Sequence, residues 1–186
     1  MGESVLSLDL RKHRRHSIRY PGYDYSLAGG YFVTIVTYQR RNLFGQIDRD
    51  HMVLSRLGML AKNEWLRSAE IRKEIRLFED EMVIMPNHLH GIVWIEQVND
   101  CPMPLSGDVH PYPNGFLQKR GLLGSFIAGF KTGVSMVARR ESDVLKVWQR
   151  NYYGHIIRND TEYDRIMAYI QDNPRRWQED ELFGMG

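Results

Sequence analysis

The sequence has little of what would place it outside the cell or in a membrane. Its 186 residues include one cysteine, Cys101, so no disulfide can form within the chain and no thiolate cluster can hold zinc. No segment approaches the roughly 18 to 20 consecutive apolar residues of a membrane-spanning helix, and the first thirty residues are basic and polar. We therefore expect a cytoplasmic protein.

The chain also lacks a strong net charge. Its 25 Lys and Arg residues against 23 Asp and Glu residues give a formal charge of +2, which is too weak to indicate a polyanionic partner. Basic residues do gather near the N-terminus, ahead of Tyr20, Tyr23 and Tyr25. Such a segment can neutralise phosphates while its rings stack on bases, although a solvated N-terminus has the same composition. The basic residues are Arg11, Lys12, Arg14, Arg15 and Arg19.

The length and composition predict one folded domain. With 42% hydrophobic and 26% charged residues, the chain can form a hydrophobic core. Its 186 residues are few for two domains that each have a core of their own. We predict a basic arm over residues 1–25, a single domain over 26–178 and a tail over 179–186. Four prolines fall between residues 97 and 120, where hydrophobic periodicity is lost, and they predict a long loop.

The periodicity of apolar residues predicts an α+β fold. β-branched and aromatic residues predict strands over 31–38, 74–85, 88–96 and 148–158, the second of them bulged at its acidic cluster 79–81. Helical spacing predicts helices over 50–68, about 121–140 and 161–173, the last capped by Asp160. This order matches the ferredoxin-like (split βαβ) arrangement, with an antiparallel sheet and one added C-terminal helix. The architecture alone does not name a function.

Two histidines of the predicted third strand form a candidate metal site. His88 and His90 are two residues apart, so their imidazoles project from the same face of the sheet. An isolated pair of histidines with this spacing often occurs by chance, so the two residues could also be ordinary, half-exposed histidines. No cysteine or third histidine stands at a suitable distance to complete a tetrahedral zinc site.

The predicted last helix presents a phenol and an amide on one face. Tyr169 and Asn173 are four residues apart and so lie one helical turn from each other. Taken singly, Tyr169 fits a packing residue, and Asn173 fits a capping residue before Pro174. Together they can offer a hydroxyl and an oxygen ligand at the same place.

Four sequence blocks resemble a known family. They are residues 30–37 (GYFVTIVT), 83–91 (VIMPNHLHG), 148–158 (WQRNYYGHIIR) and 169–174 (YIQDNP). In order and spacing they resemble the single-tyrosine HUH transposases of the insertion sequence 200/605 type, especially the REP-associated tyrosine transposases. The resemblance extends from about residue 20 to residue 178.

The resemblance implies a function and a set of site residues. His88 and His90 would bind Mg²⁺ or Mn²⁺ with Asn173 as third ligand, although other members of the family have glutamine there. Tyr169 would attack single-stranded or hairpin DNA, such as repetitive palindromic elements, and form a 5′-phosphotyrosine. Residues 26–178 would then be the catalytic domain of a nucleoid-associated monomer or homodimer. The basic arm would contact DNA, together with Lys131, Arg139, Arg140 and His155.

Two other functions remain open at this point. A domesticated protein could bind hairpin DNA without cutting it, and intact ligand residues argue against that alternative. An RNA-binding module of ferredoxin-like shape would need aromatic residues on its central strands, where Tyr31, Phe32 or Trp94 could stack on bases. That alternative leaves the histidine pair and Tyr169 without a purpose. Tyr152, Tyr153 and Tyr163 are further tyrosines near the predicted nucleophile.

Overall fold

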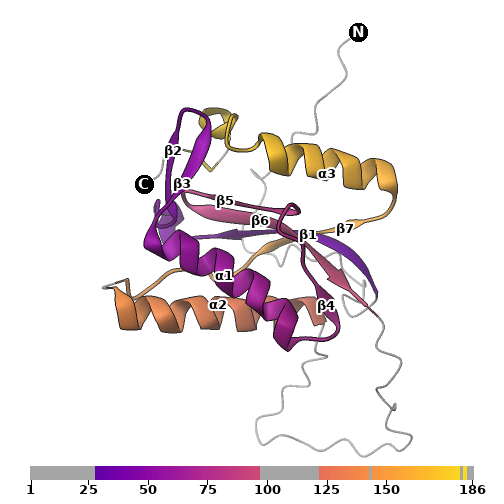
Figure 1. Ribbon diagram of the computed structural model, residues 1–186, viewed down its shortest axis with the longest axis horizontal. Helices are drawn as coiled ribbons and strands as arrows, with labels where there is room; N and C mark the ends of the chain where they lie inside the picture. Colours follow the sequence, from indigo (N-terminus) through magenta and orange to yellow (C-terminus); the bar gives the residue numbers. More distant parts are fainter. Residues whose placement is uncertain (1–27, 97–121, 143, 181, 184–186) are drawn as a thin grey trace, which may run out of the picture.

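An antiparallel sheet lies between two helices on one face and a third helix on the other (Figure 1). The computed structural model describes residues 28–96, 122–142, 144–180 and 182–183. Helices α1 (Arg56–Ile71) and α2 (Leu122–Glu141) cover the first face, and α3 (Asp160–Asp172) covers the second. The predicted basic arm and most of the predicted long loop lie outside the described residues.

The strand order is that of a ferredoxin-like sheet. It runs β4 (Ile75–Arg76), β6 (His88–Ile95), β1 (Gly29–Val36) and β7 (Tyr153–Ile157), and β5 (Met82–Met85) also pairs with β6. Every pairing is antiparallel. Because β4 and β5 both pair with β6, they occupy the position of one strand in the split βαβ pattern. The predicted α+β fold class is therefore confirmed, and α3 is its added helix.

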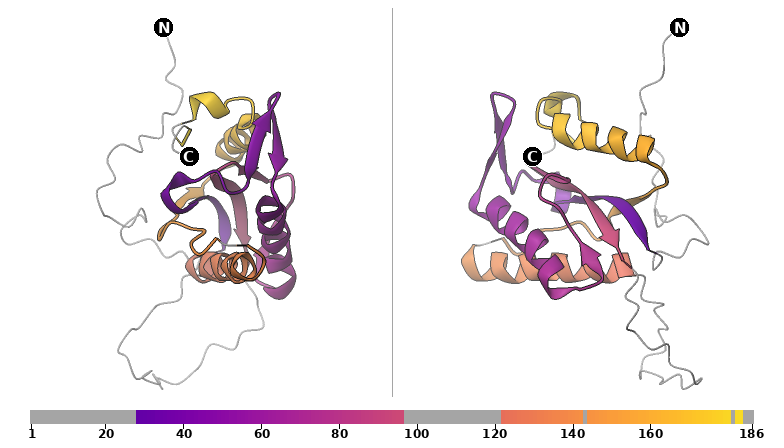
Figure 2. Two further views of the ribbon diagram at one scale, coloured as in Figure 1. Left: turned by 90° about the vertical axis from the view of Figure 1, so that its left-hand side faces the viewer. Right: turned by 45° about the vertical axis from the view of Figure 1, so that its right-hand side comes forward.

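Alternation along the strands gives the sheet two different faces. Tyr31, Val33 and Leu89 belong to the main core, which α1 and α2 cover. Their neighbours Phe32 and Ile92 face the other way and pack with Ile170 of α3. Figure 2 shows α3 on the opposite side of the sheet from α1 and α2. Since His88 and His90 have the same parity as Ile92 on β6, the register directs both imidazoles toward the α3 side.

The helix predicted from residue 50 begins later than expected. Residues 45–54 form the hairpin of β2 (Gly45–Asp48) and β3 (His51–Leu54), and α1 starts at Arg56. Ser55 caps α1, because its Oγ accepts a hydrogen bond from the Gly58 amide at 3.1 Å. The prediction was wrong here because Leu54 fits the helical spacing although it belongs to a strand.

Other predicted boundaries also change. The predicted second strand is broken into β4 and β5, and residues 77–81 leave the sheet between them. Asn159, rather than Asp160, caps α3, because its Oδ1 accepts from the Glu162 amide at 2.9 Å. The predicted fourth strand narrows to β7, with an isolated bridge between Trp148 and Thr37 before it.

None of the helices in the described part of the chain is both long enough and apolar enough to cross a membrane.

Candidate metal and nucleophile site

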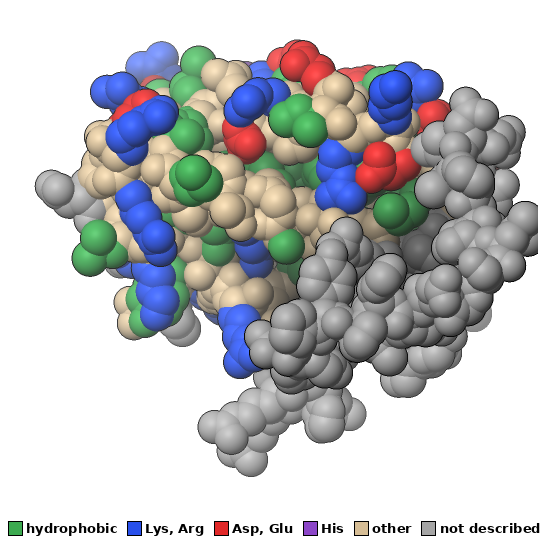
Figure 3. Space-filling view, turned by 90° about the horizontal axis from the view of Figure 1, so that it is seen from below, with side chains coloured by type: hydrophobic (Ala, Val, Ile, Leu, Met, Phe, Trp, Pro, Cys, Tyr) green, Lys and Arg blue, Asp and Glu red, His purple; other side chains and the backbone are tan. Residues whose placement is uncertain are grey.

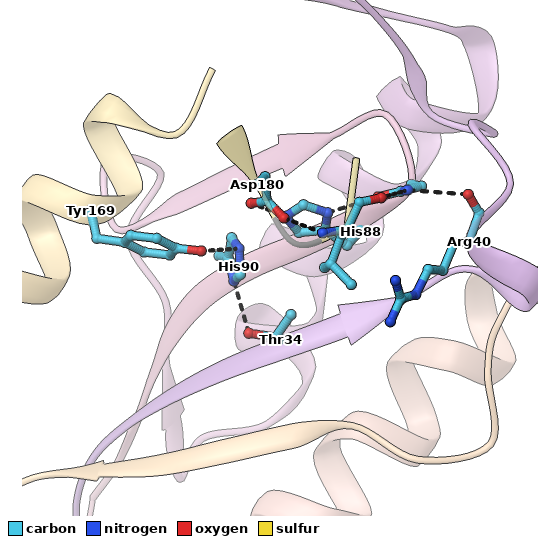
Figure 4. Close-up of polar contacts among 8 residues, drawn as sticks. Thr34, Arg40, His88, His90, Tyr169 and Asp180 are labelled. Carbon is cyan, nitrogen blue, oxygen red and sulfur yellow. Dashed lines mark hydrogen bonds and ion pairs between the residues drawn. The ribbon is translucent and has the colours of Figure 1, made fainter. Parts of the chain in front are cut away.

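The histidine pair of β6 is buried: His90 contacts Tyr169 of α3, and His88 contacts Trp177 in the segment that follows α3. The exposed fraction is 0% for His88 and 3% for His90, and their ring centroids lie 4.4 Å apart. Both rings therefore lie on one face of the sheet, as the spacing predicted (Figure 4). Two buried imidazoles at this separation can bind the same metal ion.

A buried amide orients the ring of His88. The Nδ1 atom lies 2.8 Å from Oδ1 of Asn87, an atom that only accepts hydrogen bonds. Nδ1 therefore carries the proton, and the electron pair of the ring is on Nε2. That Nε2 is buried and has no hydrogen-bond partner among the described residues. An unpaired buried acceptor of this kind suits a metal ligand.

His90 is oriented from the neighbouring strand. Thr34 of β1 lies opposite His90 in the register, and its Oγ1 is 2.8 Å from His90 Nδ1. The second nitrogen, Nε2, lies 3.2 Å from the hydroxyl of Tyr169 on α3. The register of β1 with β6 thus places Thr34 next to Nδ1 of His90, and α3 places the Tyr169 hydroxyl next to Nε2.

Both imidazoles are neutral at neutral pH. Burial lowers the pKa of His90 to about 3. Burial lowers the pKa of His88 well below its ordinary value, and electrostatic interactions with His90 and Arg40 lower it further. The deprotonated rings keep the electron pairs that a metal ion needs.

Asp180 completes a group that can hold a metal ion. Its Oδ2 lies 4.0 Å from His88 Nε2, and one ligand atom from each of His88, His90 and Asp180 falls within 4.8 Å of the others. Ligand atoms about 2.1 Å from one ion lie at most about 4.2 Å apart, so this group is close to the spacing that binding requires. Sequence reasoning missed Asp180, since the residues from 179 onward were predicted to be a tail.

Asn173 is buried at the end of α3. Its side chain is 3% exposed, and Oδ1 has no hydrogen-bond partner within the described ranges. The residue continues the helical backbone, with φ −56° and ψ −43°. A buried, unpaired amide oxygen is costly unless a partner is supplied. This supports the predicted role as an oxygen ligand, and that role stays a prediction.

Tyr169 extends from α3 toward the histidine pair. Its ring packs edge-on against His90, with 5.1 Å between centroids, and against Phe32, with 6.1 Å. The side chain is 37% exposed, so a substrate can reach it. The structure thus brings the predicted nucleophile beside His90, one of the predicted metal ligands.

Carboxylates hold α3 against the sheet at two points. Glu81 is buried, and it accepts hydrogen bonds from Trp94 Nε1 at 2.6 Å and from the Tyr163 hydroxyl at 2.8 Å. The bond to Glu81 raises the pKa of Tyr163 to about 12, which makes this tyrosine poorly suited to attack. At the second point, His155 of β7 lies 2.6 Å from Glu162 of α3.

The contact between Glu81 and Tyr163 gives a testable prediction. Replacing Tyr163 with Phe leaves the buried carboxylate one donor short, so we expect the free energy of unfolding to fall by about 1.5 kcal/mol. Urea unfolding of the wild type, Tyr163→Phe, Glu81→Gln and the double variant measures the coupling between the two residues. If the losses of unfolding free energy in the two single variants add up to the loss in the double variant, the predicted coupling between Glu81 and Tyr163 is wrong.

Of the predicted DNA contacts that lie within the described residues, three are on α2 and His155 is on β7. Burial lowers the pKa of Lys131 to about 8, and its Nζ donates to the carbonyls of Gln149 and Asn151 at 2.9 Å each. Arg139 and Arg140 are exposed on α2, across the sheet from the histidine pair. Figure 3 looks onto the face of the molecule opposite α3, where Lys and Arg side chains are scattered among acidic and apolar ones. No DNA-binding surface is defined by these positions alone, and their DNA contacts stay predictions.

Of the three aromatic residues considered for base stacking, Tyr31 and Phe32 are covered, whereas Trp94 is half-buried and donates a hydrogen bond to Glu81. Tyr31 is 0% exposed beneath α1 and α2, and Phe32 is 3% exposed beneath α3. Base stacking on an open sheet requires exposed rings. Neither ring is available for the RNA-binding alternative.

Comparison with known proteins places the chain in a family and identifies its fold. No protein-family model matches the sequence. An uncharacterized protein of Haemophilus influenzae is 42% identical over 173 residues, which cover 92% of this chain and 94% of that protein. The solved structure of a REP-associated tyrosine transposase bound to a REP hairpin is similar with a TM-score of 0.52 and 18% identity, over 86% of this chain and 73% of the other. The chain therefore belongs to one protein family with the Haemophilus influenzae protein, and it has the fold of the REP-associated tyrosine transposases.

Proposed function

We propose that the protein is a metal-dependent endonuclease and strand transferase that acts on single-stranded, hairpin-associated DNA. Tyr169 is the nucleophile and forms a 5′-phosphotyrosine. His88, His90 and Asp180 hold the ion, and Asn173 supplies a further oxygen ligand. The observation that carries the proposal is the 3.2 Å distance between the Tyr169 hydroxyl and His90 Nε2, beside a group able to bind a metal.

The donor set fits Mg²⁺ or Mn²⁺. These ions prefer oxygen ligands, which Asp180 and Asn173 offer, and Mn²⁺ also accepts imidazole nitrogen. Asp180 adds a negative charge that two neutral histidines and an amide lack. A bound ion would polarise the scissile phosphate and stabilise charge on its oxygens.

The phenol of Tyr169 performs the chemistry of strand cleavage. Its oxygen forms a bond to phosphorus as the bond from phosphorus to the 3′-oxygen breaks. The phenol proton passes to solvent, and the departing 3′-oxygen takes a proton from solvent, so the products are a 5′-phosphotyrosine and a free 3′-hydroxyl. Because a phosphodiester is replaced by another phosphodiester, the 3′-hydroxyl of a different strand can reverse the step and reseal the DNA.

Two features support hairpin DNA and action by a single chain. The structurally similar REP-associated tyrosine transposase is bound to a REP hairpin. In addition, Tyr169 and His90 meet within one chain, so one chain can supply both the nucleophile and the ion ligands. We therefore propose cleavage in cis, by a monomer or by each subunit of a homodimer.

The test uses labelled DNA and the full-length protein. Single-stranded oligonucleotides containing palindromic hairpins from the DNA flanking the gene are incubated with Mn²⁺ or Mg²⁺ and separated by denaturing electrophoresis. We expect a covalent protein–DNA adduct and a shorter strand that ends in a 3′-hydroxyl, both abolished by EDTA. Binding of the hairpin without any adduct would instead support the domesticated DNA-binding protein.

A further inference from the structure

Asn87 is fully buried, and the proposed function gives it no role. It lies in the turn between β5 and β6, next to His88. Its Nδ2 donates to the carbonyl of Leu182 at 2.7 Å and to the carbonyl of Arg40 at 3.1 Å. Its Oδ1 accepts from His88 Nδ1 at 2.8 Å. Both amide hydrogens and the amide oxygen are therefore bonded, so the orientation of the side chain is fixed.

These contacts form a chain of hydrogen bonds between His88 and Asp180. His88 Nδ1 donates to Asn87, Asn87 donates to the Leu182 carbonyl, and the Leu182 amide donates to Asp180 Oδ1 at 2.6 Å. At the far end of this chain, Asp180 Oδ2 lies 4.0 Å from His88 Nε2. The Asn87 side chain is therefore linked to two of the three candidate metal ligands. It bonds directly to His88, and it is linked to Asp180 by way of Leu182.

The Arg40 contact adds a strained segment to this arrangement. Gln39 and Arg40 both have φ of 57°, a left-handed backbone conformation that residues other than glycine rarely adopt. The strained turn directs the Arg40 carbonyl to Asn87, and Figure 4 shows Arg40 and Asp180 on two sides of His88. Strain of this kind persists only where the surrounding contacts hold it, and here one of the contacts is the Asn87 amide.

We propose that Asn87 is a positioning residue that sets the geometry of both His88 and Asp180 toward a divalent ion. The inference rests on the proposed function for the presence of an ion in this site. Asn87 keeps the His88 electron pair on Nε2, and it anchors the segment that carries Asp180. Hydrogen-bond partners behind metal ligands commonly account for 10- to 100-fold in metal affinity.

The test measures Mn²⁺ binding to the DNA-free, full-length protein. Free Mn²⁺ is quantified by electron paramagnetic resonance during a titration of the wild type, Asn87→Leu and Asn87→Ala. Leucine keeps the volume of the side chain and removes all three hydrogen bonds, whereas alanine removes them without adding bulk. We expect the Mn²⁺ affinity to fall by about tenfold in both variants. Asn63→Ala, at an exposed position of α1, is the matched control and should bind Mn²⁺ like the wild type.

A double-mutant cycle separates positioning from general damage to the fold. Asp180→Asn is measured in the wild type and in Asn87→Leu. If Asn87 acts through Asp180, removing the carboxylate costs much less affinity in the variant than in the wild type. Hydrogen exchange without metal gives a second readout: residues 177–183 should exchange faster in Asn87→Leu while α1 and α2 are unchanged. Equal losses in the two backgrounds, or unchanged exchange in residues 177–183, would overturn the inference.

The outcomes also distinguish this inference from the proposed function. A wild type that binds Mn²⁺ and forms no DNA adduct refutes the function, while the affinity losses at Asn87 still support positioning. A wild type that forms the adduct while the Asn87 variants bind Mn²⁺ normally refutes only the positioning role. No binding of Mn²⁺ by the wild type overturns the inference.

Discussion

Tyr169→Phe is expected to reduce formation of the DNA adduct by at least about 1000-fold, because phenylalanine has no oxygen to attack phosphorus. The ring contacts with Phe32 and His90 remain available to phenylalanine, so α3 should stay in place. Adduct formation is measured by denaturing electrophoresis with labelled hairpin DNA and Mn²⁺.

The controls for Tyr169→Phe are DNA binding and a second tyrosine. Hairpin affinity, measured by fluorescence anisotropy, should match that of the wild type. Tyr153→Phe, on β7 beneath α3, should keep its adduct. An adduct that persists in Tyr169→Phe and disappears in Tyr153→Phe would transfer the role of nucleophile to Tyr153.

Asp180→Asn is expected to weaken Mn²⁺ binding by roughly 100-fold, equal to about 2.7 kcal/mol, because the site loses its only carboxylate among the proposed ligands. Asparagine keeps the Oδ1 that accepts from the Leu182 amide, so the local turn is preserved. Isothermal titration with Mn²⁺ gives the affinity, and the rate of adduct formation should fall with it at limiting Mn²⁺.

Glu179→Gln is the matched control for Asp180→Asn. It removes an equal charge one residue away, where the carboxylate is exposed and pairs with Arg176. Its Mn²⁺ affinity should equal that of the wild type. Asn173→Ala completes the series, since it reports whether the amide oxygen is a further ligand. Unchanged affinity in Asp180→Asn together with a large loss in Asn173→Ala would exchange the two roles.

The main strands and the histidine pair could be predicted because their signals are local. Alternation along residues 88–95 directs His88 and His90 to one side, whatever the rest of the chain does. The four-residue spacing of Tyr169 and Asn173 likewise follows from helical geometry. What no local pattern supplied was the tertiary placement of α3 over the sheet, and that placement came only through the family resemblance.

The hairpin of β2 and β3 and the role of Asp180 could not be predicted, for different physical reasons. The hairpin turns at Arg49 and Asp50, which have φ of 46° and 65°, without the glycine that usually marks such a turn. Asp180 is one of several acidic residues near the C-terminus, and it approaches His88 only because the chain turns back beyond α3. His88 and Asp180 are about 90 positions apart in the sequence, so their approach leaves no periodic pattern from which it could be predicted.

The hydrogen bonds that link His88 to Asp180 through Asn87 and Leu182 have a consequence for the order of synthesis. At about 5–20 residues per second, a ribosome adds Asp180 several seconds after both histidines. A nascent chain that has already formed β1 and β6 holds two imidazoles and no carboxylate beside them. The three ligands can therefore come together only when translation has passed residue 182, and an interrupted product carries an incomplete centre.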